Sequence, residues 1–514
     1  MSTYRNRKMS HNYNDIPFGV VTVQRLARSC CPQLRCNKLT VFKVSTFLLT
    51  YMAYTCYHMT RKPISVVKSV LHVNCSSNVV HNSSSHDCGY APFDGSNAQA
   101  LFAILDSAFL FSYAGAMFLS GFVAERVSLR YFLALGMIIS GVCSYLFGVA
   151  KTWNIHSMAY FVYVQACAGV AQTTGWPGVV TLIGRWFGKA KRGLVFGIWN
   201  SHTSIGNILG TLIAANYVEI DWALSFMVPG IIIALCGFVM FLFVVDSPEM
   251  VGCNPQAPAA ALERDPANES DIEDNERLRS RPSERTPILD RSNPQLNSIQ
   301  RPISLKDALH IPGVVEFSLC LFFSKLVSYT FLYWLPLYIQ SSSTLGPTLS
   351  ADLSIVFDVG GIFGAIVAGL ISDLTGMSAT TCTVMLFLAA PVLLLYQQFG
   401  NVSVFMSIFL LINAGFLVNG PYALITTSVS AELGQHSSLE GNAKALATVT
   451  AIIDGTGSIG AAVGPLMAGM IASRGWQDVF YMLIISDILA MLFLVRLVKK
   501  EYHKFRRSTR TRIE

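Results

Sequence analysis

The stretch Tyr51–Lys68, YMAYTCYHMTRKPISVVK, carries an apolar run that begins near Leu39 into two adjacent cations, Arg61 and Lys62, after which the helical pattern resumes. A charged side chain at the centre of a bilayer costs about 2.5–3.5 kcal/mol on insertion scales, so such residues usually face a water-filled cavity or a partner. The alternative is that the two cations mark a helix end and extend to the membrane surface.

Three tyrosines precede these cations at a spacing of three residues: Tyr51, Tyr54 and Tyr57. This spacing places aromatic rings with hydroxyl groups along one face of a helix. The face could line a polar site, pack inside a bundle, or belong to an aromatic belt at the membrane surface.

The composition indicates an all-α membrane protein. Of 514 residues, 52% are hydrophobic and only 13% are charged. Apolar runs of 18 residues or more recur, and each can cross about 30 Å of hydrocarbon as a helix. The net charge of +7 lies mostly in tails and loops, so we expect no nucleic-acid partner.

We expect twelve transmembrane helices in two six-helix halves. The predicted spans are 39–71, 98–123, 131–150, 157–183, 193–215 and 223–246, then 312–340, 348–372, 380–398, 402–431, 444–472 and 477–497. Residues 247–311 are polar, rich in Pro and Ser, and have no apolar period, which predicts a disordered linker. The predicted organisation is a basic tail (1–38), a first half (39–246), the linker, a second half (312–497) and a second basic tail (498–514).

The two halves repeat in sequence. Gly369-x3-Asp373 follows the eighth span as Gly121-x3-Glu125 follows the second. Ser458-Ile459-Gly460 in the eleventh span matches Ser204-Ile205-Gly206 in the fifth, and this register pairs Asp454 with Asn200. A parallel repeat of this kind is typical of a secondary transporter whose substrate site lies between the halves, near the membrane midplane.

The distribution of Lys and Arg predicts that both termini are cytoplasmic, because both tails and the loop 185–192 are basic. The first connection, between spans one and two, then lies on the opposite side. It contains the N-glycosylation patterns Asn74-Cys75-Ser76 and Asn82-Ser83-Ser84, so we expect glycan on Asn74 or Asn82. A disulfide between Cys75 and Cys88 suits the same loop.

Several motifs resemble the organophosphate:phosphate antiporters of the major facilitator superfamily. Gly121, Glu125, Arg126 and Arg130 resemble the conserved loop of the superfamily. More specific matches are Tyr54-x3-His58-x2-Arg61-Lys62, Gly175-Trp176-Pro177, Arg185-Trp186-x4-Lys191-Arg192-Gly193, Trp199-Asn200, Trp334-x-Pro336, Asn419-Gly420-Pro421 and Gly475-Trp476. Among eukaryotic members, the chain most resembles the sugar-phosphate exchangers of the endoplasmic reticulum, which implies that membrane as its location.

The resemblance implies that Arg61 binds phosphate and that Lys62 joins a charge network between the halves, with Asp358 as a plausible partner. Three positions depart from the bacterial pattern. Ser328 replaces a second phosphate-binding arginine, and Lys325 lies about one helical turn earlier on nearly the same face. Thr203 replaces a histidine that this chain carries one position earlier, at His202, and Tyr333 replaces an aspartate.

Phosphate capture needs fixed positive charge and several hydrogen-bond donors. Arg61 offers a planar fork for bidentate binding, and Lys325 offers a movable point charge from the other half. Tyr54 and Tyr57 could add hydroxyl donors, and Trp176 a wall for the sugar. The predicted substrate-binding set is Arg61, Lys325, Tyr54, Tyr57, His202, Asn200 and Trp176.

A second set of residues is predicted to form the charge network and gate. It consists of Lys62, Asp358, Asp454, Glu125, Arg126 and Arg130. Counting Asp106 as well, three membrane aspartates balance the three cations Arg61, Lys62 and Lys325, so internal pairing could keep the empty site neutral. For Asp106 we expect a structural pair.

The favoured function is an antiporter that exchanges inorganic phosphate for a sugar phosphate such as glucose 6-phosphate, embedded in the lipid bilayer. Two alternatives stay open: a proton-coupled organic-anion symporter that uses Asp454 or Asp358 as proton carrier, and a membrane receptor or scaffold that transports nothing. The sequence contains no phosphatase-like Arg/His constellation, metal-ligand spacing or nucleophile turn. We therefore expect no enzyme, no cofactor and no bound metal.

Overall fold

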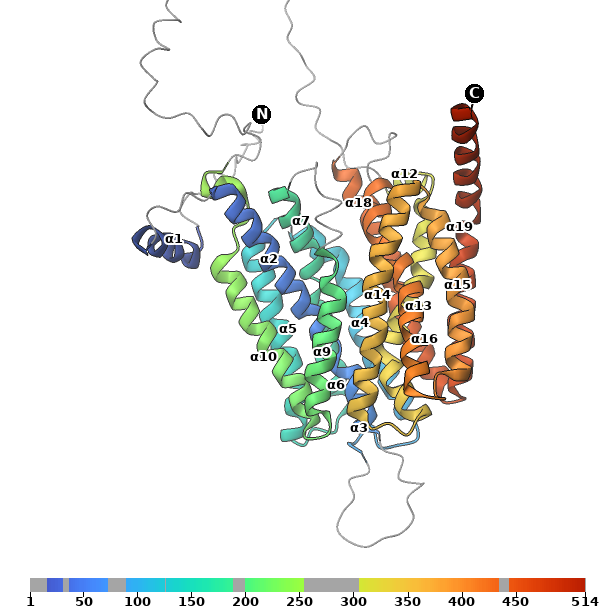
Figure 1. Cartoon of the computed structure of the whole chain (residues 1–514). Coiled ribbons are helices and arrows are strands. Elements are labelled where there is room, and N and C mark those ends of the chain that lie inside the picture. Colours follow the sequence, from blue (N-terminus) through green and yellow to red (C-terminus); the bar gives the residue numbers. More distant parts are fainter. Residues whose placement is uncertain are drawn as a thin grey trace, which may run out of the picture.

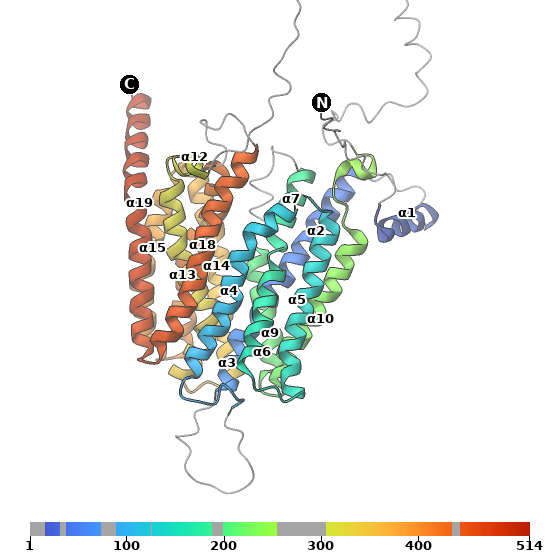
Figure 2. The same ribbon diagram turned by 180° about the vertical axis from the view of Figure 1, so that it is seen from behind.

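The computed structural model describes residues 16–30, 37–72, 89–124, 126–187, 199–253, 305–433 and 443–513. Every regular element in these ranges is a helix and none is a strand, which confirms the predicted all-α class. The long helices run side by side, and α1 and the C-terminal end of α19 lie at the same end of the bundle (Figure 1). Figure 2 shows the same arrangement from behind.

The first half of the chain contains α1 to η2: α1 (Phe18–Cys30), α2 (Lys38–Met59), α3 (Pro63–Leu71), α4 (Ala98–Ala124), α5 (Leu129–Thr152), α6 (Met158–Gln172), α7 (Gly175–Phe187), α9 (His202–Val218), α10 (Trp222–Phe243) and the short η2 (Pro248–Val251). The second half contains α12 to α19: α12 (Leu305–Leu309), α13 (Val314–Ser342), α14 (Pro347–Thr375), α15 (Ser378–Phe399), α16 (Val404–Leu424), η6 (Ile425–Val429), α17 (Ser430–Leu433), α18 (Ala443–Ala472) and α19 (Trp476–Ile513).

If α2–α3 and α6–α7 are each taken as one interrupted pass, the described residues form twelve passes, as the sequence predicts. Nine helices of the described chain are long and apolar enough to span a membrane without interruption. The other three passes are α2–α3, α6–α7 and α9. Broken helices such as α2–α3 and α6–α7 usually mark the binding site of a transporter, because their free backbone groups line a cavity.

The third and sixth passes are linked in the same way in each half. Asp246, just after α10, accepts hydrogen bonds from the first two backbone N–H groups of α5, each at 2.9 Å. Glu501 of α19 accepts two such bonds in the first turn of α15, at 2.9 and 2.8 Å. A carboxylate is favourable at a helix N-terminus, because the helix dipole is positive there. These matching caps support the internal repeat predicted from the sequence.

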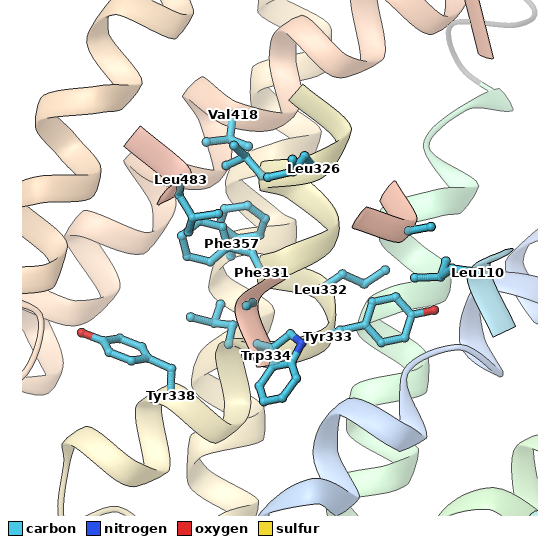
Figure 3. Packing of buried hydrophobic residues seen from close by; sticks show 14 of the residues in the cluster. Leu110, Leu326, Phe331, Leu332, Tyr333, Trp334, Tyr338, Phe357, Val418 and Leu483 are labelled. Atoms are coloured by element: carbon cyan, nitrogen blue, oxygen red, sulfur yellow. The ribbon is translucent and has the colours of Figure 1, made fainter. Parts of the chain in front are cut away.

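The two halves meet at the end of the bundle where α3 ends and α4 begins, which we call the closed end. One buried apolar cluster crosses from one half to the other there and includes Phe102 and Phe109 of α4 and Trp334 of α13. Figure 3 shows Tyr333 of α13 and Leu110 of α4 lying toward one another across this boundary. At the same end, Thr348 Oγ1 donates to the carbonyl of Ala215 at 3.3 Å.

Nearer the termini, the second buried cluster of the described residues, around Tyr54 and Trp186, contains first-half residues alone. The apolar core is therefore continuous between the halves at the closed end, whereas at the other end it separates into two. This arrangement fits one state of a two-sided carrier, with the halves in contact on one side of the site.

Three segments differ from the sequence-based boundaries. The basic N-terminal tail contains the helix α1, and η2 and α12 extend the ordered halves into the ends of the predicted linker. The predicted C-terminal tail continues α19 as helix to Ile513. The patterns at Asn74 and Asn82 and the pair Cys75–Cys88 lie outside the described residues, so they stay predictions.

Candidate functional site

The site is built around the break between α2 and α3. α2 ends at Met59, and Pro63 begins α3. Proline suits this first position, because the backbone N–H that it lacks would have no acceptor within the helix. Arg61 and Lys62 occupy the break and are only 6% and 2% exposed. The two cations therefore lie inside the bundle, which excludes the alternative that they extend from a helix end to the membrane surface.

Arg61 is held by an amide that the sequence analysis missed. Its Nε donates to Oε1 of Gln172 at 2.7 Å, and Gln172 Nε2 in turn donates to Thr60 Oγ1 at 3.0 Å and Ser140 Oγ at 3.1 Å. Gln172 ends α6, so the break of one helix faces the break of another. The available signal was a glutamine inside an apolar span, four residues before Trp176 and so on the same helix face.

The outer part of the Arg61 guanidinium has no counter-charge among the described residues. Its Cζ lies 5.0 Å from the ring centroid of Tyr113 and 5.7 Å from that of Phe109, both on α4. No described carboxylate lies within ion-pair distance of it, and no described residue accepts a hydrogen bond from its terminal nitrogens. A planar fork with free donors in a largely buried position is suited to bidentate binding of an oxyanion.

Lys325 supplies the positive charge of the second half. Its Nζ lies 2.7 Å from Oδ1 of Asp454, which joins α13 to α18, and 5.6 Å from the ring centroid of Tyr422. Lys325 is 4% exposed. Because Lys325 is already paired, an incoming anion would compete with Asp454 for this ammonium group, whereas Arg61 can bind it without such competition.

An ion pair joins the halves next to Arg61. Lys62 Nζ lies 3.5 Å from Oδ2 of Asp358, and Asn207 Nδ2 donates to Oδ1 of the same carboxylate at 3.0 Å. The predicted pairing of Lys62 with Asp358 is therefore confirmed as geometry, and its role in transport stays a prediction. Both residues are nearly fully buried, so separation of the halves would break a desolvated pair.

The predicted charge balance is wrong, because a fourth cation is present. Lys68 of α3 pairs with Asp106 of α4 at 2.5 Å and also donates to the backbone carbonyl of Tyr333 at 3.1 Å. Its Nζ lies 4.1 Å from the ring centroid of Trp334, and the ion pair is completely buried. Asp106 is therefore committed to Lys68, as a structural pair, and cannot balance Arg61. Lys68 was overlooked because it lies within the apolar sequence of α3.

The predicted aromatic residues gather around Tyr54. Its ring contacts those of Trp176, His58 and His202, with centroids 5.8, 5.6 and 4.5 Å away. No described residue makes a hydrogen bond to the Tyr54 hydroxyl, which leaves that group available. In contrast, the Tyr57 hydroxyl is 2.9 Å from Thr174 Oγ1, so it already fixes the break between α6 and α7.

The remaining predicted substrate residues lie at different depths. His202 is 0% exposed and packs against Trp199, with ring centroids 4.1 Å apart. Contact between substrate and His202 would therefore require its neighbours to move. Trp176 and Asn200 are partly exposed, and Asn200 lies in the turn before α9. Their contact with substrate stays a prediction.

The predicted gate loop lies at the end opposite to the closed end. Glu125 is outside the described residues, and Arg126 is exposed in the turn after α4. Arg130 is 7% exposed and lies against the rings of Tyr131 and Phe241, 4.6 and 5.4 Å from their centroids. In this state, these contacts of Arg130 stay within the first half.

Comparison with known families gives one match over most of the chain. A sequence profile described as Major Facilitator Superfamily matches residues 52–439. Glucose-6-phosphate exchanger SLC37A2 of Mus musculus is 55% identical over 466 residues, which cover 90% of this chain and 93% of the relative. Glucose-6-phosphate exchanger SLC37A1 of Homo sapiens is 46% identical over 505 residues, 90% of this chain and 93% of the relative.

Solved structures support the fold at low sequence identity. A bacterial homologue of the human lysosomal transporter Spinster, inward-facing and occupied, has a TM-score of 0.59 at 15% identity and covers 91% of this chain and 97% of its own. A D-xylose-proton symporter has a TM-score of 0.57 at 16% identity, with 89% and 98% covered. At this identity, the likeness concerns the arrangement of helices alone.

Proposed function

The chain belongs to the major facilitator superfamily, among its sugar-phosphate antiporters, and we propose that it exchanges a sugar phosphate for inorganic phosphate by alternating access. Relatives named glucose-6-phosphate exchangers favour glucose 6-phosphate as the sugar phosphate. The proposal adds two points to family membership: inorganic phosphate as the counter-substrate, and a site centred on Arg61.

The observation that carries the proposal is the uncompensated guanidinium of Arg61. Gln172 fixes Nε, while the terminal nitrogens are left without a described acceptor. A phosphoryl group is the chemical part that inorganic phosphate and a sugar phosphate share. A single anion site can therefore bind either of them in turn, as exchange requires.

The position of Arg61 between the halves suggests how binding drives the cycle. Arg61 belongs to the first half, and the other substrate cation, Lys325, belongs to the second half. An anion bound by both would draw the halves together over the site, at the end where their cores are now separate. Opening of the closed end would then separate Lys62 from Asp358.

We also propose that the protein resides in the endoplasmic reticulum membrane with both termini in the cytosol. The basic tails and the basic loop 185–192 support this orientation. The described residues add that α1 and the end of α19 lie at one end of the bundle and the start of α4 at the other. Protease protection of tags at the two termini in intact microsomes would test the orientation.

Counterflow in proteoliposomes tests the function directly. Vesicles loaded with phosphate should take up labelled phosphate, and then labelled glucose 6-phosphate, while vesicles without internal anion should take up neither. Collapse of the pH gradient should leave phosphate–phosphate exchange unchanged. Uptake that needs a proton gradient but no internal phosphate would overturn the exchange mechanism in favour of symport.

A further inference from the structure

The C-terminal part of α19 presents a row of cations that no function discussed so far requires. Lys499, Lys500, Lys504, Arg506 and Arg507 follow one another at spacings that place all five on less than half of the helix circumference, at about 100° per residue. We call these five residues the basic face. All of them are exposed, and no described acidic residue pairs with Lys499, Lys500, Lys504 or Arg506.

The position of the helix makes the basic face accessible. α19 has 38 residues, or about 57 Å at 1.5 Å per residue, against about 30 Å for the hydrocarbon core of a bilayer. Its last turns project beyond the other helices (Figures 1 and 2). Glu501, which caps α15, lies outside the basic face, about 140° around α19 from its middle. The basic face is therefore turned away from α15.

The chain itself contains a segment of opposite charge. Residues 263–276, ERDPANESDIEDNE, hold seven acidic residues and one arginine, a net charge of −6. This acidic segment belongs to residues 254–304, which connect Cys253 to α12. We propose that the acidic segment 263–276 docks on the basic face of α19 in the same molecule.

The ends of the connection support docking within one molecule. α12 begins at Leu305, and Glu316 in the first turn of the next helix already forms a 3.3 Å ion pair with Arg496 of α19. The connection therefore returns to the bundle beside the basic face. The 28 residues 277–304 separate the acidic segment from α12, and the random-coil estimate for 28 residues is a root-mean-square span of roughly 30 Å. The effective concentration of the acidic segment near α19 is then on the order of millimolar.

Two measurements on the full-length protein, purified into phosphatidylcholine nanodiscs, test the docking. Carbodiimide joins a carboxylate to an amine that touches it, so it should cross-link peptides from 263–276 to Lys499, Lys500 or Lys504. Docking should also protect the basic face from trypsin. Each exposed ion pair changes an equilibrium about twofold, so three pairs predict cleavage after Lys504 and Arg506 roughly tenfold faster once the seven acids are changed to Asn or Gln.

A matched variant controls for altered linker composition. Arg277, Arg279, Arg281 and Arg285 changed to Gln alter the same connection but keep the acidic segment, so this variant should keep the protection. Three results would overturn the proposal. The first is a cleavage rate that does not depend on the seven acids. The second is cross-links found only between different copies in a sample of mixed isotopes. The third is protection that appears only with acidic lipids, which would assign the basic face to headgroups.

Discussion

At the scale of single residues, the geometry of the guanidinium is what distinguishes Arg61 from any other buried cation. Its Nε donates to Gln172, and its terminal nitrogens have no acceptor among the residues that the structure describes, whereas a lysine has no planar fork that could be held in this way. The two adjacent charges inside an apolar run indicated a site at Arg61 and Lys62 but left open that they mark a helix end. It was the resemblance to the antiporter motif that assigned phosphate binding to Arg61. The sequence was insufficient for Gln172 and Lys68, since single polar residues in apolar helices reveal their partners only after folding.

Substitutions at the two substrate cations should separate the need for shape from the need for charge. We expect Arg61→Lys to impair phosphate exchange severely, because charge remains while the fork is lost. Lys325→Arg should keep partial activity, whereas Lys325→Ala should lose most of it. Charged hydrogen bonds contribute about 1.5–3 kcal/mol, so each loss predicts roughly a 10–150-fold weaker apparent affinity in counterflow. Normal exchange by Arg61→Lys, at wild-type yield in the membrane, would refute the site assignment.

Changes at Gln172 should test whether the orientation of Arg61 matters. Gln172→Glu has nearly the same shape but places a carboxylate 2.7 Å from Arg61 Nε, so it should neutralise Arg61 and abolish phosphate binding. Gln172→Leu removes the acceptor without adding charge, so it should weaken binding less. The measurement is the phosphate concentration that gives half-maximal counterflow. If Gln172→Glu binds phosphate as tightly as wild type, Arg61 is not the anion site.

At the scale of elements, the informative feature is the pair of broken helices. Residues 60–62 and 173–174 interrupt the first and fourth passes at positions that face each other. The apolar pattern predicted both passes as continuous helices, because a break of two or three residues hardly changes the hydropathy of a long segment. The proline that starts α3 was visible in the sequence. The break before Gly175 depends instead on contacts formed after folding, from Gln172 to Thr60 and from Thr174 to Tyr57 of α2.

The pair Lys62–Asp358, which joins the break before α3 to α14, should show energetic coupling. Asp358→Asn would leave Lys62 buried without a counter-charge and should slow exchange. Lys62→Gln should also slow exchange, because it leaves the Asp358 carboxylate buried without a cation. The double variant removes both charges and should recover part of the rate. Exchange rates of the four proteins give the coupling energy, and losses that simply add would show that the pair does not act as a unit.

At the scale of the whole molecule, the twelve passes and the two-half repeat could be predicted, since both follow from hydropathy and from motifs repeated along the chain. Of the contacts between the halves, the pairing of Lys62 with Asp358 could be predicted from the resemblance. The position of the closed end could not, because it depends on which state the carrier adopts. The length of α19 was also not predicted. Its last turns are highly charged, and a charged composition predicts a tail outside the membrane rather than the continuation of a helix. The charged face becomes evident only when the segment is placed on a helix.

The orientation of the whole molecule should be visible in the chemistry of its first connection. We expect Asn74 or Asn82 to carry glycan and Cys75 to be oxidised with Cys88, because the positive-inside rule places this connection away from the cytosol. A glycosidase should increase the mobility of the native protein on a gel, and Asn74→Gln with Asn82→Gln should remove that shift. Alkylation of both thiols without reductant would contradict the bridge.

The extra cation at Lys68 has a kinetic consequence. Among the described residues, three of the four cations around the site, Lys62, Lys68 and Lys325, each pair with an aspartate, whereas Arg61 does not, so the empty site holds one surplus positive charge. To reorient without cargo, the carrier must enclose that charge away from water, whereas a bound phosphate cancels it. The unloaded carrier should therefore return slowly, and each crossing in one direction must wait for an anion to cross back. Efflux of labelled phosphate into anion-free buffer should accordingly be far slower than efflux into buffer that contains phosphate. Equal rates would contradict the idea that the surplus positive charge enforces one-for-one exchange.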